Sequence, residues 1–271
     1  ILVEDTLVAL QNMARYRRNH TAVKILGITG SVGKTSAKEM LKLCFSEYGA
    51  TYATSGNYNN HIGLPICLCN MPESSEFAIL EMGMNHADEI SFLSKIAKPE
   101  IAFITNVEAV HLEFFDSVEG IAHAKAEIFD GMDQGGFAVL PADNAYYKIL
   151  RAAASGCDII SFGESDGSTF KLLSPAVEYE YRGESRGFTL STRGAHWPKA
   201  ALGILGCIAA LGLPLEKAEA ALAQYQEQQG RGAVETIAWQ GGEITLMDDA
   251  YNASPVSMAA AIATLAQLGQ G

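Results

Sequence analysis

The sequence has 271 residues, of which 48% are hydrophobic and 18% are charged. This composition is typical of a globular protein with a large buried core, arranged as one large domain or two smaller ones. The 19 basic and 31 acidic residues give a formal net charge of −12, which argues against a general nucleic-acid or membrane-surface binder, although a local basic cradle can still hold an anionic ligand.

The first 20 residues have an amphipathic helical pattern that contains Arg15, Arg17 and Arg18, and they do not resemble a signal peptide. The longest apolar stretch, residues 200–215, is too short to span a bilayer comfortably. We therefore expect a buried helix that ends near Gly212 and no membrane insertion. The five cysteines are odd in number and form no C-x-x-C pair, which favours reduced thiols and a cytoplasmic location.

Residues 24–40, KILGITGSVGKTSAKEM, place a glycine-rich bend between an apolar, β-branched run and a helical pattern. Lys34 and Thr35 follow the bend at once. A strand, a glycine-rich turn and Lys-Thr at the start of a helix are typical of a phosphate-binding loop, in which backbone N–H groups and the lysine hold phosphates and the hydroxyl can bind Mg²⁺. The match to G-x-x-x-x-G-K-[ST] is imperfect, because Ile28 stands at the first glycine position. The alternative is a strand–helix turn with an accidental Lys-Thr pair.

Strand and helix patterns alternate along the rest of the chain. Short apolar runs are followed by polar turns and helical patterns, which predicts an α/β fold with a doubly wound, mostly parallel sheet of the P-loop type, whose ligands lie beyond the carboxyl ends of the strands. Residues 163–193 are rich in Gly, Ser and Glu with alternating aromatic residues, and they predict a small antiparallel β insertion. The predicted strands are 77–80, 101–105, 137–140, 158–162, 233–238 and 243–248, and the predicted helices are 88–97, 118–132, 197–228 and 255–268.

Polar residues with metal-binding chemistry follow two of these strands. Glu81 comes directly after the run 77–80, where an acid in a P-loop fold can bind Mg²⁺. The alternative is a solvated glutamate at the strand end. Asn106 and His111 follow the next strand, and a histidine at this place could bind a second metal ion.

Two further places have candidate side chains. Asp248, Asp249 and Asn252 come at the end of a predicted strand, and their oxygens suit ribose hydroxyls and a base edge. Lys125 lies on a predicted helix, where a lone lysine is usually a solvated cation. Lys34 is expected to be a solvent-facing loop charge.

Taken together, six motifs resemble the central ATPase domain of the Mur ligases. Their order and their spread over nearly the whole chain make the resemblance far more specific than the phosphate loop alone. It also accounts for the irregular loop, because this family has T-G-[ST]-x-G-K-[ST], which residues 29–35 satisfy. The motifs are ITGSVGKTS, TSGNYNNHIGLP, LEMGMNHADEI, ITNVEAVHLEFF, AKAEIF and DDAYNASP.

The resemblance implies roles for phosphate and metal ligands. Lys34 and the loop amides would hold the β- and γ-phosphates of ATP. Thr35 and Glu81 would bind one Mg²⁺, and His111 would help to bind a second one. Lys125 aligns with the family's carbamylated lysine, which CO₂ converts into an anion able to bind metal, so Lys34, His111 and Lys125 would be the catalytic residues. The loop consists of Thr29, Gly30, Ser31, Val32, Gly33, Lys34, Thr35 and Ser36.

The resemblance implies further contacts as well. Asp249 and Asn252 would meet ribose and adenine, and Arg231 would lie near the phosphates. Asn57 and Asn60 would face the nucleotide-sugar peptide. The sequence departs from the family at HWPKAALG, where Trp197 and Ala200 replace asparagines, and at Pro141, which replaces another asparagine. These departures put in question how adenine is held on that side.

The implied chemistry is ATP-driven amide formation in peptidoglycan precursor synthesis. DDAYNASP and GNYNNHIGLP are most like the branch of the family that joins D-alanyl-D-alanine to UDP-N-acetylmuramoyl-tripeptide through an acyl phosphate. We expect a monomer that binds no nucleic acid, and we expect the family's N-terminal nucleotide-sugar domain and C-terminal dinucleotide-fold domain to be absent from residues 1–271. The alternatives are a folylpolyglutamate synthase and a regulatory P-loop nucleotide-binding module without ligase activity.

Overall fold

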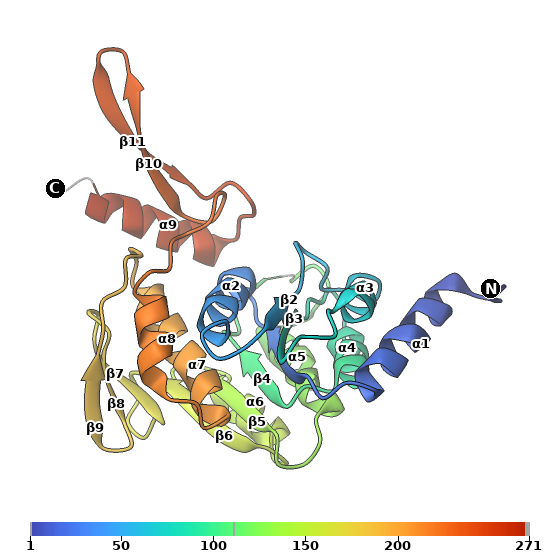
Figure 1. The fold of residues 1–271 in the computed structure, drawn as a ribbon. Helices are drawn as coiled ribbons and strands as arrows, with labels where there is room; N and C mark the ends of the chain where they lie inside the picture. The colour runs from blue at the N-terminus through green and yellow to red at the C-terminus, as the bar shows by residue number, and fades with distance from the viewer. Residues whose placement is uncertain (1, 111, 269–271) are drawn as a thin grey trace.

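The computed structural model describes residues 2–110 and 112–268. Its main feature is one large sheet (Figure 1), whose strands in spatial order are β2 (Thr51–Ala53), β3 (Phe77–Glu81), β1 (Lys24–Thr29), β4 (Ile101–Ile104), β5 (Phe137–Pro141), β6 (Asp158–Gly163), β7 (Phe170–Ser174), β8 (Glu178–Tyr181) and β9 (Glu184–Gly187). Neighbouring strands from β2 to β7 are parallel, and β8 and β9 are antiparallel to their neighbours. The predicted α/β class with a mostly parallel sheet is confirmed.

Helices cover both faces of this sheet. One face carries α2 (Lys34–Phe45), α7 (His196–Ala210) and α8 (Leu215–Leu222), and the other carries α1 (Thr6–Asn19), α3 (Gly63–Asn70), α4 (Glu89–Ala97), α5 (Val118–Ala126), the 3₁₀ helix η1 (Glu127–Gly131) and α6 (Tyr147–Ala153). Successive strand residues point to opposite faces. Leu26 therefore packs with α2, α7 and α8, whereas Ile25 belongs to the core on the other side. None of the described helices is both long and apolar enough to cross a membrane.

The predicted antiparallel segment is present, but it is an extension of the main sheet and not a separate insertion. Strand β7 pairs in parallel with β6, with Phe162 opposite Phe170, and β8 and β9 continue the sheet outward. Aromatic side chains explain this continuity, since Tyr179 is fully buried and the ring of Tyr181 stacks on Phe170 with centroids 4.3 Å apart.

The arginines of α1 bind the ends of two other helices. Arg17 donates a hydrogen bond to the carbonyl of Met71 (3.1 Å), directly after α3. Arg18 donates to the carbonyls of Ala97 (2.6 Å) and Lys98 (2.7 Å) at the end of α4. Because the last carbonyls of a helix lack partners within the helix, these contacts satisfy groups that would otherwise be unpaired.

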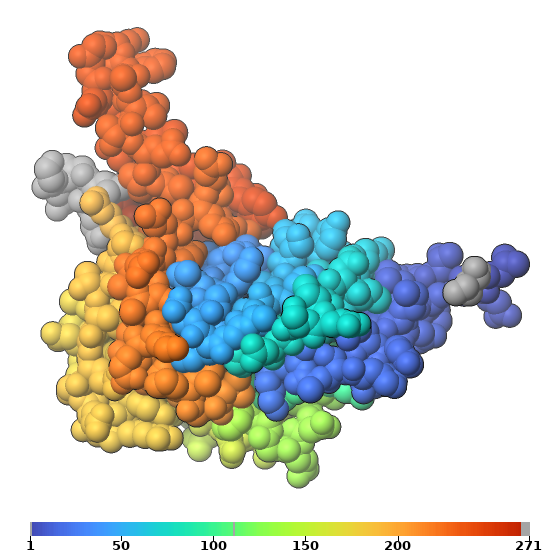
Figure 2. Space-filling model, in the orientation of Figure 1, coloured from blue at the N-terminus to red at the C-terminus, as the bar shows by residue number. Residues whose placement is uncertain are grey.

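A smaller unit, which we call the hairpin lobe, consists of β10 (Ala233–Trp239), β11 (Gly242–Asp248) and α9 (Pro255–Leu268). Strands β10 and β11 pair only with each other within the described residues. Figure 1 shows the hairpin extending away from the main sheet, with α9 between the hairpin and the ends of α7 and α8. In the space-filling view the same residues form a projection above the body (Figure 2).

Strand β1 marks the place where the winding of the sheet changes direction. It pairs with β3 on one side and with β4 on the other, so that Ile28 lies opposite both Glu81 and Phe103. In doubly wound folds, ligands bind beyond the carboxyl ends of the strands at such a switch point. The loop that follows β1 lies at this point.

Candidate functional site

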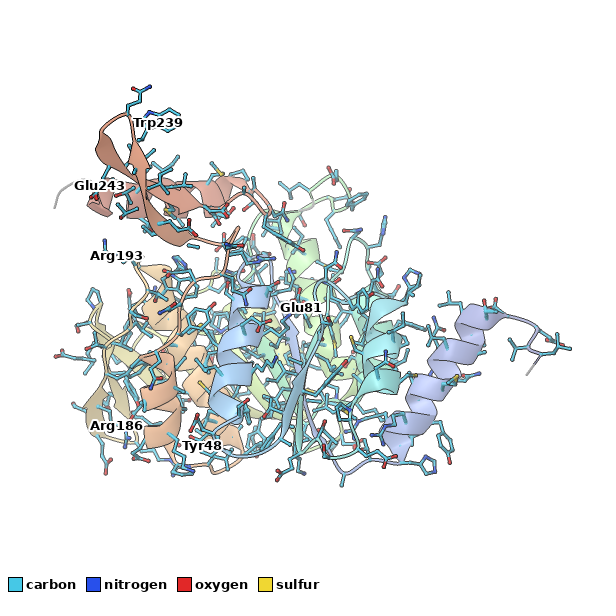
Figure 3. All side chains as sticks on the ribbon, turned by 45° about the horizontal axis from the view of Figure 1, so that its top comes forward. Tyr48, Glu81, Arg186, Arg193, Trp239 and Glu243 are labelled. Carbon is cyan, nitrogen blue, oxygen red and sulfur yellow. The ribbon has the colours of Figure 1, made fainter. Side chains whose placement is uncertain are left out.

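A cleft of about 1510 Å³ opens beyond the carboxyl ends of β1, β3 and β4. The body contributes the loop after β1 and the segments after β3 and β4 to its lining, and the hairpin lobe contributes residues 247–264 in part. Figure 3 shows Glu81 at this end of the sheet beside α2. The cleft therefore brings together residues from both ends of the chain.

The loop after β1 is held by the segment that follows β4. The hydroxyl of Ser31 donates to the carbonyl of Glu108 (3.0 Å) and accepts a hydrogen bond from the N–H of the same residue (2.8 Å). The side-chain oxygen of Asn106 accepts from the N–H of Val32 (3.0 Å). These bonds fix the loop from outside, and they give Asn106 a positioning role.

Glycine is required where the loop approaches this segment. A Cβ on Gly30 would lie 1.9 Å from Oγ1 of Thr105, a distance that no side chain can tolerate. Gly33 precedes α2 in the left-handed region, with a φ of 79°. The first hydrogen bond of α2 runs from the N–H of Ala37 to the carbonyl of Gly33 (2.9 Å). The two glycines thus allow the sharp turn from β1 into α2.

The first turn of α2 presents backbone N–H groups to the cleft. Within the described part of the chain, no hydrogen bond is found from the N–H groups of residues 33–36. The N-terminal N–H groups of a helix have no partners within it, and the helix dipole makes this end partially positive. Residues 33–36 line the cleft, so the arrangement suits a phosphate group.

Lys34 is half-buried beside this turn, so the expectation of a solvent-facing loop charge is wrong. Its ammonium donates to the carbonyl of Gly30 (2.7 Å) and makes a longer contact with that of Ser31 (3.4 Å). The pKa of Lys34 is lowered overall, chiefly by burial. The negative charge of Glu81 opposes this shift, and the positive charge of Arg231 adds to it. The ammonium is thus held by carbonyl groups of the same loop whose N–H groups would bind phosphate.

Glu81 is 2% exposed, so it is not a solvated strand-end glutamate. Its oxygen Oε2 accepts a hydrogen bond from the hydroxyl of Thr35 (3.1 Å), and Oε1 accepts one from Nδ2 of Asn59 (2.9 Å). A hydroxyl beside a carboxylate fits Mg²⁺, which binds one or two protein oxygens and completes its shell with water and phosphate. Among the described residues, no group of three His, Cys, Asp or Glu side chains could hold a metal ion by itself.

Lys125 is buried on α5, so the solvated-cation alternative is wrong. Its side chain is 2% exposed. Burial places the pKa of Lys125 well below its ordinary value, and the positive charge of Lys34 lowers it further. Lys34 lines the cleft, whereas Lys125 is not among the described residues that line it. The other predicted catalytic residue, His111, lies outside the described residues.

The predicted ribose and phosphate contacts line the same cleft from the hairpin lobe and the turn before it. The guanidinium of Arg231 stacks over the ring of Tyr251, with Cζ 4.2 Å from the centroid. Burial raises the pKa of Asp249, and the negative charge of Asp248 raises it further. The positive charge of Arg231 offsets part of this rise. Asn252 accepts the N–H of Ala253 (2.9 Å), so its amide group remains able to donate.

The asparagines of GNYNNHIGLP have different environments. Asn57 and Asn60 are exposed and line the cleft. The side-chain oxygen of Asn60 also accepts the N–H groups of Ile62 (3.1 Å) and Gly63 (2.8 Å) at the start of α3. Asn59, which sequence reasoning missed, is the one that binds Glu81. The motif indicated a site, but three asparagines in four residues could not be told apart.

The opposite wall contains the departures from the family pattern. Trp197 is buried on α7 against Tyr225, with ring centroids 5.5 Å apart, and Ala200 and Pro141 line the cleft. Trp197 and Ala200 place an aromatic ring and a methyl group on this wall in place of amide groups. A nearby ion pair between Lys199 and Asp143 (3.0 Å) was also missed, because its members are far apart in the sequence.

The fold and the cleft together define a P-loop nucleotide-binding α/β domain. Residues 28–206 match the family described as the Mur ligase middle domain, and the chain belongs to this family. The chain is 40% identical to the UDP-N-acetylmuramoyl-tripeptide–D-alanyl-D-alanine ligase of Rickettsia prowazekii, over 99% of this chain and 61% of that protein. It is 36% identical to the ligase of the same name from Bacillus subtilis, over 97% of this chain and 57% of that protein.

Solved structures agree with this assignment. The chain is similar to a crystal structure of MurF from Acinetobacter baumannii, with a TM-score of 0.90 and 33% identity over 98% of this chain and 59% of that one. It is also similar to MurF ligase from Thermotoga maritima in complex with ADP, with a TM-score of 0.85 and 28% identity over 98% and 62% of the two chains. The chain thus spans about 60% of the length of these relatives.

Proposed function

We propose that this chain is the ATP-binding part of a ligase that joins D-alanyl-D-alanine to UDP-N-acetylmuramoyl-tripeptide. The observation that carries the proposal is the juxtaposition in one cleft of free helix N–H groups, the Lys34 ammonium and the Thr35–Glu81 pair. The names of the relatives support the choice of substrates. They also favour this reaction over a folylpolyglutamate synthase or a regulatory nucleotide-binding module.

The reaction has two steps. A carboxylate oxygen of the tripeptide attacks the γ-phosphorus of ATP, the bond to the bridging oxygen breaks, and ADP leaves, giving an acyl phosphate. The amine of D-alanyl-D-alanine then attacks the acyl carbon, phosphate leaves and the amine loses a proton. Lys34 and the N–H groups of residues 33–36 would stabilise the charge on the phosphates. Bound Mg²⁺, held in part by Thr35 and Glu81, would neutralise further charge on the transferred group.

We further propose that Lys125 is carbamylated. The neutral amine attacks the carbon of CO₂ and releases one proton, so the neutral side chain becomes an anion. The burial of Lys125 supports this proposal, because it favours the neutral amine that the reaction needs. An anion at this position would lower the net positive charge around Lys34, and it would add an oxygen ligand for metal.

The test of the nucleotide site is Lys34→Ala, measured by isothermal titration with ATP and Mg²⁺. We expect the Kd for ATP to rise by at least about tenfold, because a charge-assisted contact to phosphate is lost. Lys148→Ala, at an exposed lysine of α6, is the matched control and should bind ATP as the wild type does. Unchanged affinity in Lys34→Ala would contradict the phosphate-site assignment.

The test of the reaction is the release of ADP. We expect ADP release by the natural protein to require both UDP-N-acetylmuramoyl-tripeptide and D-alanyl-D-alanine. A regulatory module would hydrolyse ATP at the same rate without either acceptor, and a folylpolyglutamate synthase would require a folate and glutamate. Each alternative thus has its own substrate dependence.

A further inference from the structure

Lys38 is a buried lysine of α2 that the proposed chemistry does not use. It lies one helical turn after Lys34 and is 2% exposed. Its ammonium donates to the carbonyl of Thr54 (2.8 Å), makes a longer contact with the carbonyl of Gly56 (3.5 Å) and pairs with Glu39 (3.1 Å). A buried ammonium requires such partners, and two of them belong to the segment directly after β2. Lys38 therefore ties this segment to the helix that begins at the phosphate loop.

The same segment, residues 54–60, also contacts the end of β3 at two places. At its start, the hydroxyl of Thr54 accepts the N–H of Glu81 (2.9 Å). At its other end, Asn59 donates to Oε1 of Glu81 (2.9 Å), and the carbonyl of Asn59 accepts the N–H of Gly83 (2.8 Å). Both the backbone and the carboxylate of Glu81 are thus held by residues 54–60.

We propose that Lys38 is a positioning residue, which holds residues 54–60 against α2 so that Asn59 fixes the Glu81 carboxylate beside Thr35. The proposal rests on the proposed Mg²⁺–nucleotide site. Thr35 and Lys38 share one helix, so the hydroxyl and the anchor of the segment move together. Without residues 54–60, the Glu81 carboxylate would keep only the hydrogen bond from the Thr35 hydroxyl, and Oε1 would lose its partner Asn59. Groups that orient a metal ligand through hydrogen bonds control metal affinity without touching the metal.

A purely structural role for Lys38 predicts a different result. Loss of a buried structural contact would lower stability and would weaken ATP binding to the same extent with and without Mg²⁺. Loss of a positioning contact would act on the Mg²⁺-dependent part of binding. The two roles can therefore be separated by the dependence of ATP affinity on Mg²⁺ concentration.

The experiment compares Lys38→Met with Lys42→Met. Methionine keeps the length of the side chain and removes its donors, and Lys42 is an exposed lysine one turn further along α2. ATP is titrated calorimetrically in EDTA and at a series of Mg²⁺ concentrations. We expect Lys38→Met to raise the half-saturating Mg²⁺ concentration about tenfold and to leave the affinity in EDTA unchanged. Lys42→Met should match the wild type.

Three outcomes would count against the idea. A Mg²⁺ dependence of Lys38→Met equal to that of the wild type would overturn the positioning role and leave the nucleotide site intact. Equal weakening in EDTA and in Mg²⁺ would assign Lys38 a structural role only. Absence of Mg²⁺-dependent ATP binding in the wild type would instead overturn the proposed function, and the inference with it.

A second variant keeps the proposal testable if Lys38→Met does not fold. Asn59 lies on a partly exposed segment, and Asn59→Leu removes the contact to Glu81 with little change in volume. We expect the same tenfold rise in the half-saturating Mg²⁺ concentration. Where both variants fold, the double variant should show no further rise, because both changes break the same series of contacts from Lys38 through residues 54–60 to Glu81, which we call the relay. An unaffected Asn59→Leu, or additive effects in the double variant, would overturn the relay.

Discussion

At the residue scale, Lys125 shows how burial changes the chemistry of a side chain. On the surface a lysine amine is protonated at neutral pH, and it cannot attack CO₂ while it carries the proton. With 2% exposure and a second amine nearby, the pKa of Lys125 falls well below its ordinary value. The sequence alone could not reveal this, because burial depends on how α5 packs against the sheet.

Lys125→Met is therefore expected to remove a carbamate and to stabilise the fold. With ¹³C-labelled bicarbonate, the wild type should give a carbamate signal by NMR, and Lys125→Met should not. In buffer free of CO₂ the variant should be more stable at pH 7. The reason is that the unfolded wild type binds its proton more tightly than the folded state does, because burial disfavours the charged amine. The free energy of unfolding of the wild type therefore rises with pH over the range between the lowered pKa of the folded state and the ordinary lysine pKa. Lys148→Met serves as the control, and an unchanged signal in Lys125→Met would refute the assignment.

Replacing Asp143 is expected to lower the stability of the fold, whereas replacing Lys125 is expected to raise it. Burial alone would raise its pKa, but hydrogen bonds from the Ser165 hydroxyl and from the Glu164 N–H, together with Lys199, outweigh burial and bring the pKa to about 2, from an ordinary 3.8. A carboxylate with a lowered pKa stabilises the fold above its ordinary pKa, and this contribution is lost as the pH falls from about 4 to about 2. Because the side chain is partly exposed, we expect about 1 kcal/mol.

The measurement for Asp143→Asn is urea unfolding at several pH values. The variant should be less stable than the wild type at pH 6, and the difference should shrink below pH 4. A difference that stays constant between pH 6 and pH 3 would mean that the charge of Asp143 does not contribute.

The candidate site was predictable where one short segment carries it. The phosphate loop could be predicted from residues 24–40, because strand, glycines, lysine and threonine are contiguous. Glu81 followed from its place at a strand end. The contacts of Asn59 and Lys38 could not be predicted, because they depend on how the segment after β2 folds back over β3 and α2. Equivalent polar residues in one motif give no signal that tells them apart.

At the scale of elements, α7 approaches the sheet closely through a glycine. A Cβ on Gly203 would lie 2.6 Å from Cζ of Phe103 on β4, which is closer than packed side chains allow. We expect Gly203→Val to lower the free energy of unfolding by about 2 kcal/mol, because overpacking forces the ring or the helix to move. Chemical denaturation measures the change. Gly156→Ala, where a Cβ meets nothing within 4 Å, is the control and should change stability by less than about 0.5 kcal/mol. Equal effects would show that α7 can shift freely.

The elements that sequence patterns missed share a physical property. Strand β2 has three residues, α6 has seven, and α3 begins with Gly63 and contains Pro65. Such short elements have too few turns or alternations for a periodic signal, and packing on the main sheet stabilises them. The place of β7–β9 at the sheet edge was also missed, because strand pairing is a contact between distant residues.

At the scale of the whole molecule, the hairpin lobe is expected to unfold more easily than the body. Strands β10 and β11 are exposed along most of their length, and they pair only with each other among the described residues. A two-stranded hairpin with two solvated faces contributes little stability of its own. Replacing residues 234–247 with a short Gly-Ser turn should change the Tm by less than about 3 °C. Calorimetry measures this, and a fall of more than about 10 °C would show that the hairpin supports the body.

The position of β1 between β3 and β4 has a consequence for folding kinetics. The strands that frame the cleft come from residues 24–29, 77–81 and 101–104, so two crossovers must form before the loop after β1 meets residues 105–108. Pairings between distant segments form slowly, and the cleft is complete only when they are in place. ATP with Mg²⁺ should therefore slow unfolding in stopped-flow experiments and leave the refolding rate unchanged. Faster refolding would mean that the cleft forms early. The expected result would mean that the nucleotide stabilises the folded protein against unfolding without helping the chain to fold.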